Sequence, residues 1–268
     1  MAMQHPQFDP VALSLGPFAI HWYGLMYLLS FLVGWAAAVY RTRLPHVHWT
    51  KDDISDFLFY VVLGVVLGGR IGYMLFYHPD ILLSDPLELF YIWNGGMSFH
   101  GGMLGVFIGC WWYGRKSDRT FFDVTDFVAP VIPIGLFFGR IANFINAELV
   151  GRVTDVPWAM VYPQIDNLPR HPSQLYQAGL EGPVFLALLW WFARRSRPRM
   201  AVSGVFLLGY GCLRFFSEFF RLPDAHLGFI AFDWMTMGQA LCLPMIAGGL
   251  LLLWLAYGRS STTAEHGA

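Results

Sequence analysis

Seven apolar runs divide the 268-residue chain, and each approaches the length needed to cross a lipid bilayer. A spanning helix needs about 20 mostly apolar residues. Hydrophobic side chains make up 56% of the sequence and charged ones 13%, against about 25% charged residues in a typical soluble domain. The sequence therefore predicts an all-α polytopic membrane protein with about seven transmembrane helices. We expect these helices at Phe18–Tyr40, Phe57–Tyr77, Phe99–Tyr113, Phe121–Ile145, Leu175–Ala193, Val202–Phe220 and Thr236–Tyr257.

The third run is shorter than the others. Because 15 or so residues are too few to cross a bilayer, we expect its helix to begin before Phe99, near Tyr91 or Gly95.

The positions of the basic residues predict the orientation in the membrane, because Lys and Arg concentrate in cytoplasmic loops. Eleven of the seventeen Lys and Arg residues follow the first, third, fifth and seventh runs. Three lie on the opposite side, namely Arg152, Arg170 and Arg221. We therefore expect the N-terminus outside, in the periplasm, and the C-terminus in the cytoplasm.

Two outer connections are longer than a turn. His78–Trp93 is rich in Pro, Asp and Leu, and we expect it to lie along the membrane surface. Asn146–Pro172 is polar and contains four prolines, so residues 146–172 are expected to form a small periplasmic head. Neither segment is large enough to fold independently, and residues 1–268 are therefore predicted to form one integral membrane domain.

Costly polar residues occur inside the predicted spans. An arginine deep in an apolar helix raises the free energy of membrane insertion by roughly 3 kcal/mol or more. Such a residue is therefore a candidate functional residue. Arg140 and Asn143 are three positions apart, so they share a helix face. Arg140 precedes Asn146 by six residues, which places it about 9 Å below the outer end of its helix.

Four further residues are expected at a comparable depth in the outer leaflet. They are Arg70, Arg214, His100 and Tyr23. Each also has a structural interpretation. Arg70 can extend its side chain to the headgroups, and Arg214 can pair with Glu218 at i+4. Tyr23 fits an interfacial aromatic belt. His100 is ordinarily a hydrogen-bonded core residue, but Gly101 and Gly102 follow it and allow close approach of a ligand or a helix.

Buried arginines without a partnering carboxylate cluster favour an anion, and phosphate suits the planar guanidinium best. At the depth of the outer leaflet, the available phosphate is that of a phospholipid headgroup. No cluster of metal-binding spacing is present, and Cys110, Cys212 and Cys242 lie inside apolar runs. There is also no GxSxG or HExxH motif. Residue chemistry alone thus predicts a polytopic protein that binds a phospholipid phosphate.

Five motifs in order along the whole chain resemble the bacterial prolipoprotein diacylglyceryl transferase family. They are IHWYGLMY at 20–27, SFHGGMLG at 98–105, GRIANFINAELVG at 139–151, RHPSQLYQ at 170–177 and YGCLRFFSEFFRLPD at 210–224. The family usually has Glu where Gln177 stands, so no catalytic role is assigned to that side chain.

The resemblance implies a multi-pass enzyme of the bacterial inner membrane. It would transfer the sn-1,2-diacylglyceryl group of phosphatidylglycerol to the lipobox cysteine thiol of a preprolipoprotein, forming a thioether and releasing glycerol 1-phosphate. The partners implied are phosphatidylglycerol, the lipobox signal peptide and membrane lipids, with no nucleic acid, no metal and no cofactor.

The same resemblance implies roles for individual residues. Arg140 and Arg214 would hold the departing phosphate, with Arg70 as a further lipid contact. His100 is the titratable candidate for activating the thiol, although the positive field of the arginines is an alternative. Six residues match family positions tied to activity, namely Tyr23, Asn143, Glu148, Gly151, Tyr210 and Glu218. Of these, Gly151 is expected to permit a backbone turn more than to contact the substrate.

Two other functions fit the same composition. A transporter or flippase would use buried arginines to bind an anionic substrate, but the inverted repeats and paired broken helices of many transporters are not clear here. In a purely structural membrane subunit, the arginines would instead pair with carboxylates of partner helices.

Overall fold

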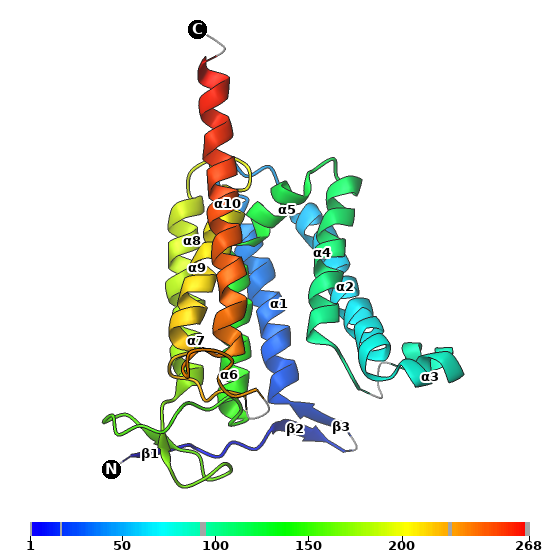
Figure 1. Cartoon of the computed structure of the whole chain (residues 1–268). Coiled ribbons are helices and arrows are strands. Elements are labelled where there is room, and N and C mark those ends of the chain that lie inside the picture. Colours follow the sequence, from blue (N-terminus) through cyan, green and yellow to red (C-terminus); the bar gives the residue numbers. More distant parts are fainter. Residues whose placement is uncertain (1, 17, 92–94, 225–226, 266–268) are drawn as a thin grey trace. The chain divides into compact units, whose positions relative to one another are not determined.

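The computed structural model describes residues 2–16, 18–91, 95–224 and 227–265, and they are mostly helical (Figure 1). The chain forms two compact units, one of residues 1–37 and 128–268 and one of residues 38–127. The expectation of a single membrane domain stays a prediction.

The first unit contains β1 (Met3–Gln4), β2 (Val11–Leu15), β3 (Phe18–His21), most of α1 (Trp22–Arg41), α6 (Ile132–Ile145), β4 (Met160–Val161), β5 (Pro169–Arg170), α7 (Ser173–Gly179), the π-helical turn η3 (Leu180–Val184), α8 (Phe185–Ala193), α9 (Ala201–Ser217) and α10 (Met237–Glu265). The second contains α2 (Lys51–Tyr77), α3 (Pro79–Ser84), the 3-10 helix η1 (Pro86–Phe90), α4 (Phe99–Lys116) and nearly all of α5 (Phe121–Val128).

Among the described residues, three helices are long and apolar enough to cross a membrane: Trp22–Arg41, Lys51–Tyr77 and Met237–Gly258. The number becomes four if α5 and α6 form one bent span. α9 is apolar but has only 17 residues. The protein is thus a helical membrane protein, as predicted, and seven spans remain a prediction.

The starts of the first and third predicted helices differ from the sequence-based expectation. Phe18–His21 is a strand, β3, paired with β2, so that the first helix begins at Trp22. α4 begins at Phe99, because the Ser98 side chain caps it by accepting from Gly101 N. The expected earlier start near Tyr91 or Gly95 is therefore wrong.

The fourth apolar run is two helices rather than one. α5 ends at Val128, α6 begins at Ile132, and the two axes are bent by 54°. Pro130 lies in the break and Pro133 in the first turn of α6. Since proline lacks an N–H and disfavours the helical conformation in the residue before it, these two prolines account for the break.

The fifth run is a continuous but kinked chain of α7, η3 and α8. The kink lies at Gly182, whose φ and ψ are −92° and −107°, and Pro183 follows it. A Cβ on Gly182 would lie only 2.8 Å from Cβ of Phe137 on α6. The glycine therefore allows the kinked chain to pack closely against α6 next to Glu181.

α6 also packs against α1 within the first unit. Met26, Ala142 and Ile145 form a buried cluster, and Trp22 and Phe138 pack against it. Since Ala142 and Ile145 flank Asn143, this apolar contact fixes the end of α6 that carries the predicted polar residues.

Residues 146–172, with the N-terminus, form a small three-stranded sheet in the order β1-β4-β5. β1 pairs with β4 in parallel and β4 pairs with β5 in antiparallel fashion. His5, 2% exposed, contacts the backbone oxygen of Phe144 through Nε2 at 2.8 Å and stacks on Tyr162. The sheet is thereby attached to the end of α6.

In the second unit, α2 and α4 pack through glycines. Cβ atoms on Gly101 and Gly105 would overlap the carbonyl oxygens of Gly68 and Gly64. Small residues let helix backbones approach closely, which is a common way to associate helices in membranes. Gly101, the first glycine after His100, thus serves helix packing, one of the two roles expected for it. The segment from His78 onward forms α3 and η1, and its residues 92–93 lie outside the described part of the chain.

Candidate functional site

The candidate site is a polar cluster in the first unit, built from α6, η3, α9 and the start of α10. Glu181 on η3 is its centre and is fully buried. Its Oε2 accepts a hydrogen bond from Arg140 Nε at 3.0 Å, and its Oε1 lies 3.7 Å from Arg214 Nη1. One carboxylate thus connects arginines from two helices and brings Arg140 and Arg214 together.

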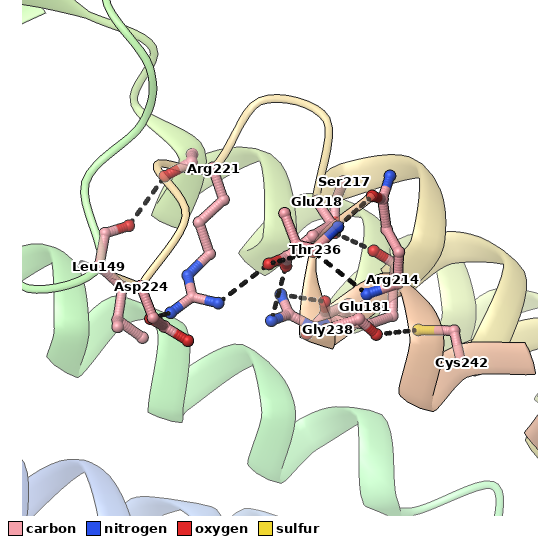
Figure 2. A network of polar contacts seen from close by, with 12 residues as sticks. Leu149, Glu181, Arg214, Ser217, Glu218, Arg221, Asp224, Thr236, Gly238 and Cys242 are labelled. Atoms are coloured by element: carbon pink, nitrogen blue, oxygen red, sulfur yellow. Dashed lines mark hydrogen bonds and ion pairs between the residues drawn. The ribbon is translucent and has the colours of Figure 1, made fainter. Parts of the chain in front are cut away.

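Glu218 is the second carboxylate of the cluster (Figure 2). It is 1% exposed. Its Oε2 lies 2.8 Å from Arg214 Nη2. Its Oε1 accepts from Arg221 Nη1 at 3.0 Å and from Thr236 Oγ1 at 3.2 Å. The i+4 pair of Arg214 and Glu218 is therefore present, as its sequence spacing allowed.

Gly238 and Asp224 complete the surroundings of Glu218 (Figure 2). A Cβ on Gly238 would lie 2.8 Å from Cδ of Glu218, so a glycine is needed for the carboxylate to approach the first turn of α10. Asp224 accepts a hydrogen bond from Arg221 Nη2. A helix N-terminus favours negative charge, which adds to the stabilisation of Glu218.

The charges of the cluster balance. Arg140, Arg214 and Arg221 pair with Glu181, Glu218 and Asp224. The expectation that the arginines lack partnering carboxylates is therefore wrong. It failed because Glu181 and Arg140 are 41 positions apart, and no local spacing reveals such a pair.

The guanidinium groups nevertheless keep free hydrogen-bonding capacity. Arg140 contacts Glu181 through Nε. This contact does not involve the two Nη nitrogens of Arg140. Arg214 Nη1 is buried without a hydrogen-bond partner among the described residues, since 3.7 Å to Glu181 is too long for one. Both side chains retain about one-seventh exposure, 15% and 14%. An anion with several oxygens is a suitable ligand for such groups.

Asn143 lies on α6 one turn after Arg140 and contacts Glu148, as Nδ2 donates to Oε2 at 2.9 Å. The segment after α6 is held by α7. Gln174 donates to the backbone oxygen of Glu148 at 2.6 Å, and Ser173 donates to that of Leu149 at 2.9 Å. Asn143 and Glu148 therefore form one positioned pair beside the arginine cluster.

Gly151 is a point of close backbone approach. It forms an isolated β-bridge with Arg221, and its carbonyl oxygen accepts from Arg170 Nη1 at 3.0 Å. A Cβ at Gly151 would overlap the carbonyl oxygen of His171. This packing requires a glycine without any contact to substrate.

Charged groups of residues 146–172 support that backbone. The Arg170 guanidinium donates to both carboxylate oxygens of Asp166 and holds the pKa of that carboxyl below its usual range. Burial lowers the pKa of His171, whose Nδ1 lies 3.2 Å from the Tyr176 hydroxyl.

The two predicted tyrosines differ in their surroundings. Tyr210 lies one turn before Arg214 on α9, and its ring stacks on Phe206 with centroids 6.0 Å apart. Tyr23 lies in the first turn of α1, is 37% exposed and contacts Tyr27. Tyr210 thus accompanies the arginine cluster, whereas Tyr23 has the exposure of a belt residue.

Arg70 and His100 belong to the second unit. Arg70 is 3% exposed and donates to the backbone oxygens of Leu89, Glu88 and Gly95 and to the Glu88 carboxylate. Gly95 has a φ of +76°, which glycine adopts readily. In this conformation its carbonyl oxygen accepts from the Arg70 guanidinium. Arg70 therefore holds the backbone at Glu88, Leu89 and Gly95.

His100 is the second residue of α4 and is exposed. Its ring contacts that of Phe99 with centroids 5.7 Å apart. An exposed imidazole at a helix start is open to an incoming group, and its expected role as a base stays a prediction.

Sequence reasoning missed Glu181, Arg221 and Thr236. Glu181 carried a usable signal, because it is the only charged residue of the apolar run Leu175–Ala193. A glutamate inside an apolar helix is unfavourable for the same reason as Arg140. Arg221 was assigned to an outer loop by its position after the sixth run, and Thr236 has no charge to attract notice.

No group of three or more His, Cys, Asp or Glu side chains that could hold a metal ion occurs in the described parts of the chain.

Comparison with known proteins supplies an independent result. A family model described as prolipoprotein diacylglyceryl transferase matches residues 10–255. A phosphatidylglycerol–prolipoprotein diacylglyceryl transferase of Pseudomonas fluorescens is 54% identical over 261 residues, which cover 96% of this chain and 97% of the relative. One of Coxiella burnetii is 54% identical over 255 residues, covering 95% and 98%. The resemblance seen in the five motifs is confirmed.

Proposed function

Because the chain belongs to the prolipoprotein diacylglyceryl transferase family, we propose that it transfers the sn-1,2-diacylglyceryl group of phosphatidylglycerol to the lipobox cysteine of a preprolipoprotein. The products are a thioether-linked diacylglyceryl protein and glycerol 1-phosphate. The family match over nearly the whole chain carries this proposal.

Arg140 and Arg214 hold the phosphate of the lipid in this reaction. The observation that supports this role is their shared contact with Glu181. The carboxylate orients both guanidinium groups and leaves nitrogens of each available. Fixed donors aimed at developing charge often provide the largest part of a rate enhancement. Glu181 and Glu218 are positioning residues for this clamp.

The thiolate sulfur attacks the glyceryl carbon, a C–S bond forms, and the C–O bond to phosphate breaks. The electron pair leaves with the phosphate oxygen, so that charge on the phosphate grows as the arginines bind it. A free thiol has a pKa of about 8.5 and must first lose its proton.

A base is the more suitable means of activating the thiol. The three arginines of the cluster are matched by three carboxylates, so their net positive field is small. Arginine itself stays protonated. We assign the role of accepting the thiol proton to His100, which is exposed at the start of α4.

The remaining predicted residues have supporting roles in the proposal. Asn143 and Glu148 contact the glycerol of the headgroup, and Tyr210 borders the phosphate one turn from Arg214. Tyr23 contacts lipid at the interface. Arg70 and Gly151 shape the backbone around them. The hydrogen bonds of Arg70 to carbonyl oxygens and the bridge between Gly151 and Arg221 support these roles.

We also propose seven spans in the bacterial inner membrane, with the N-terminus and residues 146–172 in the periplasm and the C-terminus in the cytoplasm. The distribution of Lys and Arg supports this orientation. It places the arginine cluster in the outer half of the bilayer, where both phosphatidylglycerol and an exported lipobox are accessible.

The test uses purified protein, phosphatidylglycerol and a lipobox peptide. The proposal predicts that the peptide mass increases by one diacylglyceryl group and that glycerol 1-phosphate is released in equal amount. A peptide without the cysteine is the control. Absence of both products would refute the transferase function, and movement of phospholipid between vesicle leaflets without chemistry would favour the transporter.

A further inference from the structure

Four polar side chains follow one face of α7 and η3, and all four are completely buried. They are Ser173, Gln174, Gln177 and Glu181. Three of them have partners. Ser173 and Gln174 bind the backbone of residues 148–149, Gln174 also accepts from Tyr162, and Glu181 binds Arg140.

Gln177 differs from its neighbours. Both its Nε2 and its Oε1 are buried without a hydrogen-bond partner among the described residues. A primary amide that is removed from water and left unpaired destabilises a protein, and buried polar groups are therefore nearly always paired. An exception beside a functional cluster requires an explanation.

The neighbours of Gln177 define where its amide lies. One turn earlier on the same helix, Gln174 holds Glu148, which pairs with Asn143. One turn later, Glu181 pairs with Arg140. Arg140 and Asn143 are themselves adjacent on α6, against which α7 packs. Gln177 thus stands between the arginine cluster and the Asn143–Glu148 pair.

An amide offers a donor and an acceptor side by side. Its natural complement is a group that also donates and accepts, such as a hydroxyl. A phosphate ester has acceptors only and an ammonium has donors only. In phosphatidylglycerol, the headgroup hydroxyls lie next to the phosphate that Arg140 and Arg214 are proposed to hold.

We propose that Gln177 is a specificity-determining residue whose amide binds a hydroxyl of the glycerol headgroup. This inference rests on the proposed function and extends it from the phosphate to the alcohol. A site built around a buried hydrogen bond to a hydroxyl rejects analogues that lack the hydroxyl, because its own polar group is then unpaired.

The test compares two lipids with the same phosphate, phosphatidylglycerol and phosphatidylpropanol, as donors to a lipobox peptide. The wild-type protein prefers phosphatidylglycerol in kcat/KM. In Gln177→Leu, the preference falls by about tenfold or more, because the loss is confined to the lipid with hydroxyls. Thermal stability of Gln177→Leu without lipid is equal to or above that of the wild type, since an unpaired buried amide is removed.

Gln174→Leu is the matched control, as it changes the same residue type one turn earlier where both amide atoms are bonded. It lowers thermal stability, because two hydrogen bonds of a buried amide are lost. Gln177→Met provides a second, unbranched variant in case leucine does not fit.

An unchanged preference in Gln177→Leu or Gln177→Met would overturn the inference while leaving the transferase function intact. A fall in stability of both variants equal to that of Gln174→Leu would also overturn it, by making Gln177 structural. Failure of the wild type to modify the peptide with either lipid would instead refute the proposed function itself, and this inference with it.

Discussion

Arg140 on α6 donates from Nε to Oε2 of Glu181 at 3.0 Å, although the two residues are 41 positions apart. The carboxylate is fully buried and the arginine side chain 15% exposed. Breaking a buried ion pair by removing one partner is strongly destabilising, so this contact fixes the position of the guanidinium. The proposed phosphate clamp depends on that fixed position.

Neutralising Glu181 tests whether it positions the arginines. Glu181→Gln keeps the side-chain shape but loses the ionic contact with Arg140, and a hydrogen bond to a charged group contributes about 1.5–3 kcal/mol. We expect thermal unfolding to show a loss of this size and kcat to fall further than KM rises. Asp155→Asn, which neutralises an exposed carboxylate, should change neither. A Glu181→Gln protein with normal kcat would remove the positioning role.

Replacing His100 tests the base. A His100→Gln protein keeps a polar side chain of similar reach but cannot accept the thiol proton at neutral pH. General acid–base catalysis contributes roughly 10²–10⁴-fold, so we expect a rate loss in that range in the lipobox assay. If the variant retained most of its rate, the proton would have to go elsewhere.

The glycine contact between α2 and α4 makes a prediction for stability alone. A methyl group at Gly105 would overlap the Gly64 carbonyl oxygen. Gly105→Ala should therefore lower the free energy of unfolding by about 1–3 kcal/mol, the usual effect of overpacking. Gly102→Ala is the control on the same helix, because its Cβ would lie 3.6 Å from Val65 O, an ordinary contact. Equal melting temperatures for the two variants would contradict the packing of these helices.

We predict that His171 makes the stability of the protein depend on pH. Burial lowers the pKa of its imidazole below the ordinary value of about 6.5. The unfolded chain then binds a proton at a higher pH than the folded one, so stability falls as pH drops below about 6.5. We expect the difference in melting temperature between pH 7.5 and pH 5.5 to be smaller in His171→Gln than in the wild type. A difference of the same size would exclude this histidine as its source.

The helices of the membrane region were predictable because apolar length is a local signal. The runs that contain α1, α2 and α10 meet the length criterion in the structure as well. The break between α5 and α6 had a signal in Pro130 and Pro133, but the apolar run continues across it and suggested a single helix. For α4, the capping residue Ser98 was a weaker sequence signal than the short length of the third apolar run, so an earlier helix start was expected.

The site was predictable only in part. Arg140 and Arg214 stood out as costly residues, and their positions near the C-terminal ends of two helices followed from counting residues. Their carboxylate partner did not, since Glu181 reaches Arg140 through the packing of a kinked segment against α6. A search for every charged residue in an apolar run, of either sign, would have included Glu181.

The rate of diacylglyceryl transfer by Arg140→Lys tests phosphate binding by Arg140 most directly. Lysine keeps the positive charge but lacks the planar fork that binds two phosphate oxygens. Removing one fixed donor at a developing charge costs about 10²–10³-fold in kcat, and we predict a loss of that order in protein that inserts and purifies as the wild type does. Arg195→Lys, at an exposed position, should keep the full rate. A near-normal rate for Arg140→Lys would contradict phosphate binding by the Arg140 guanidinium.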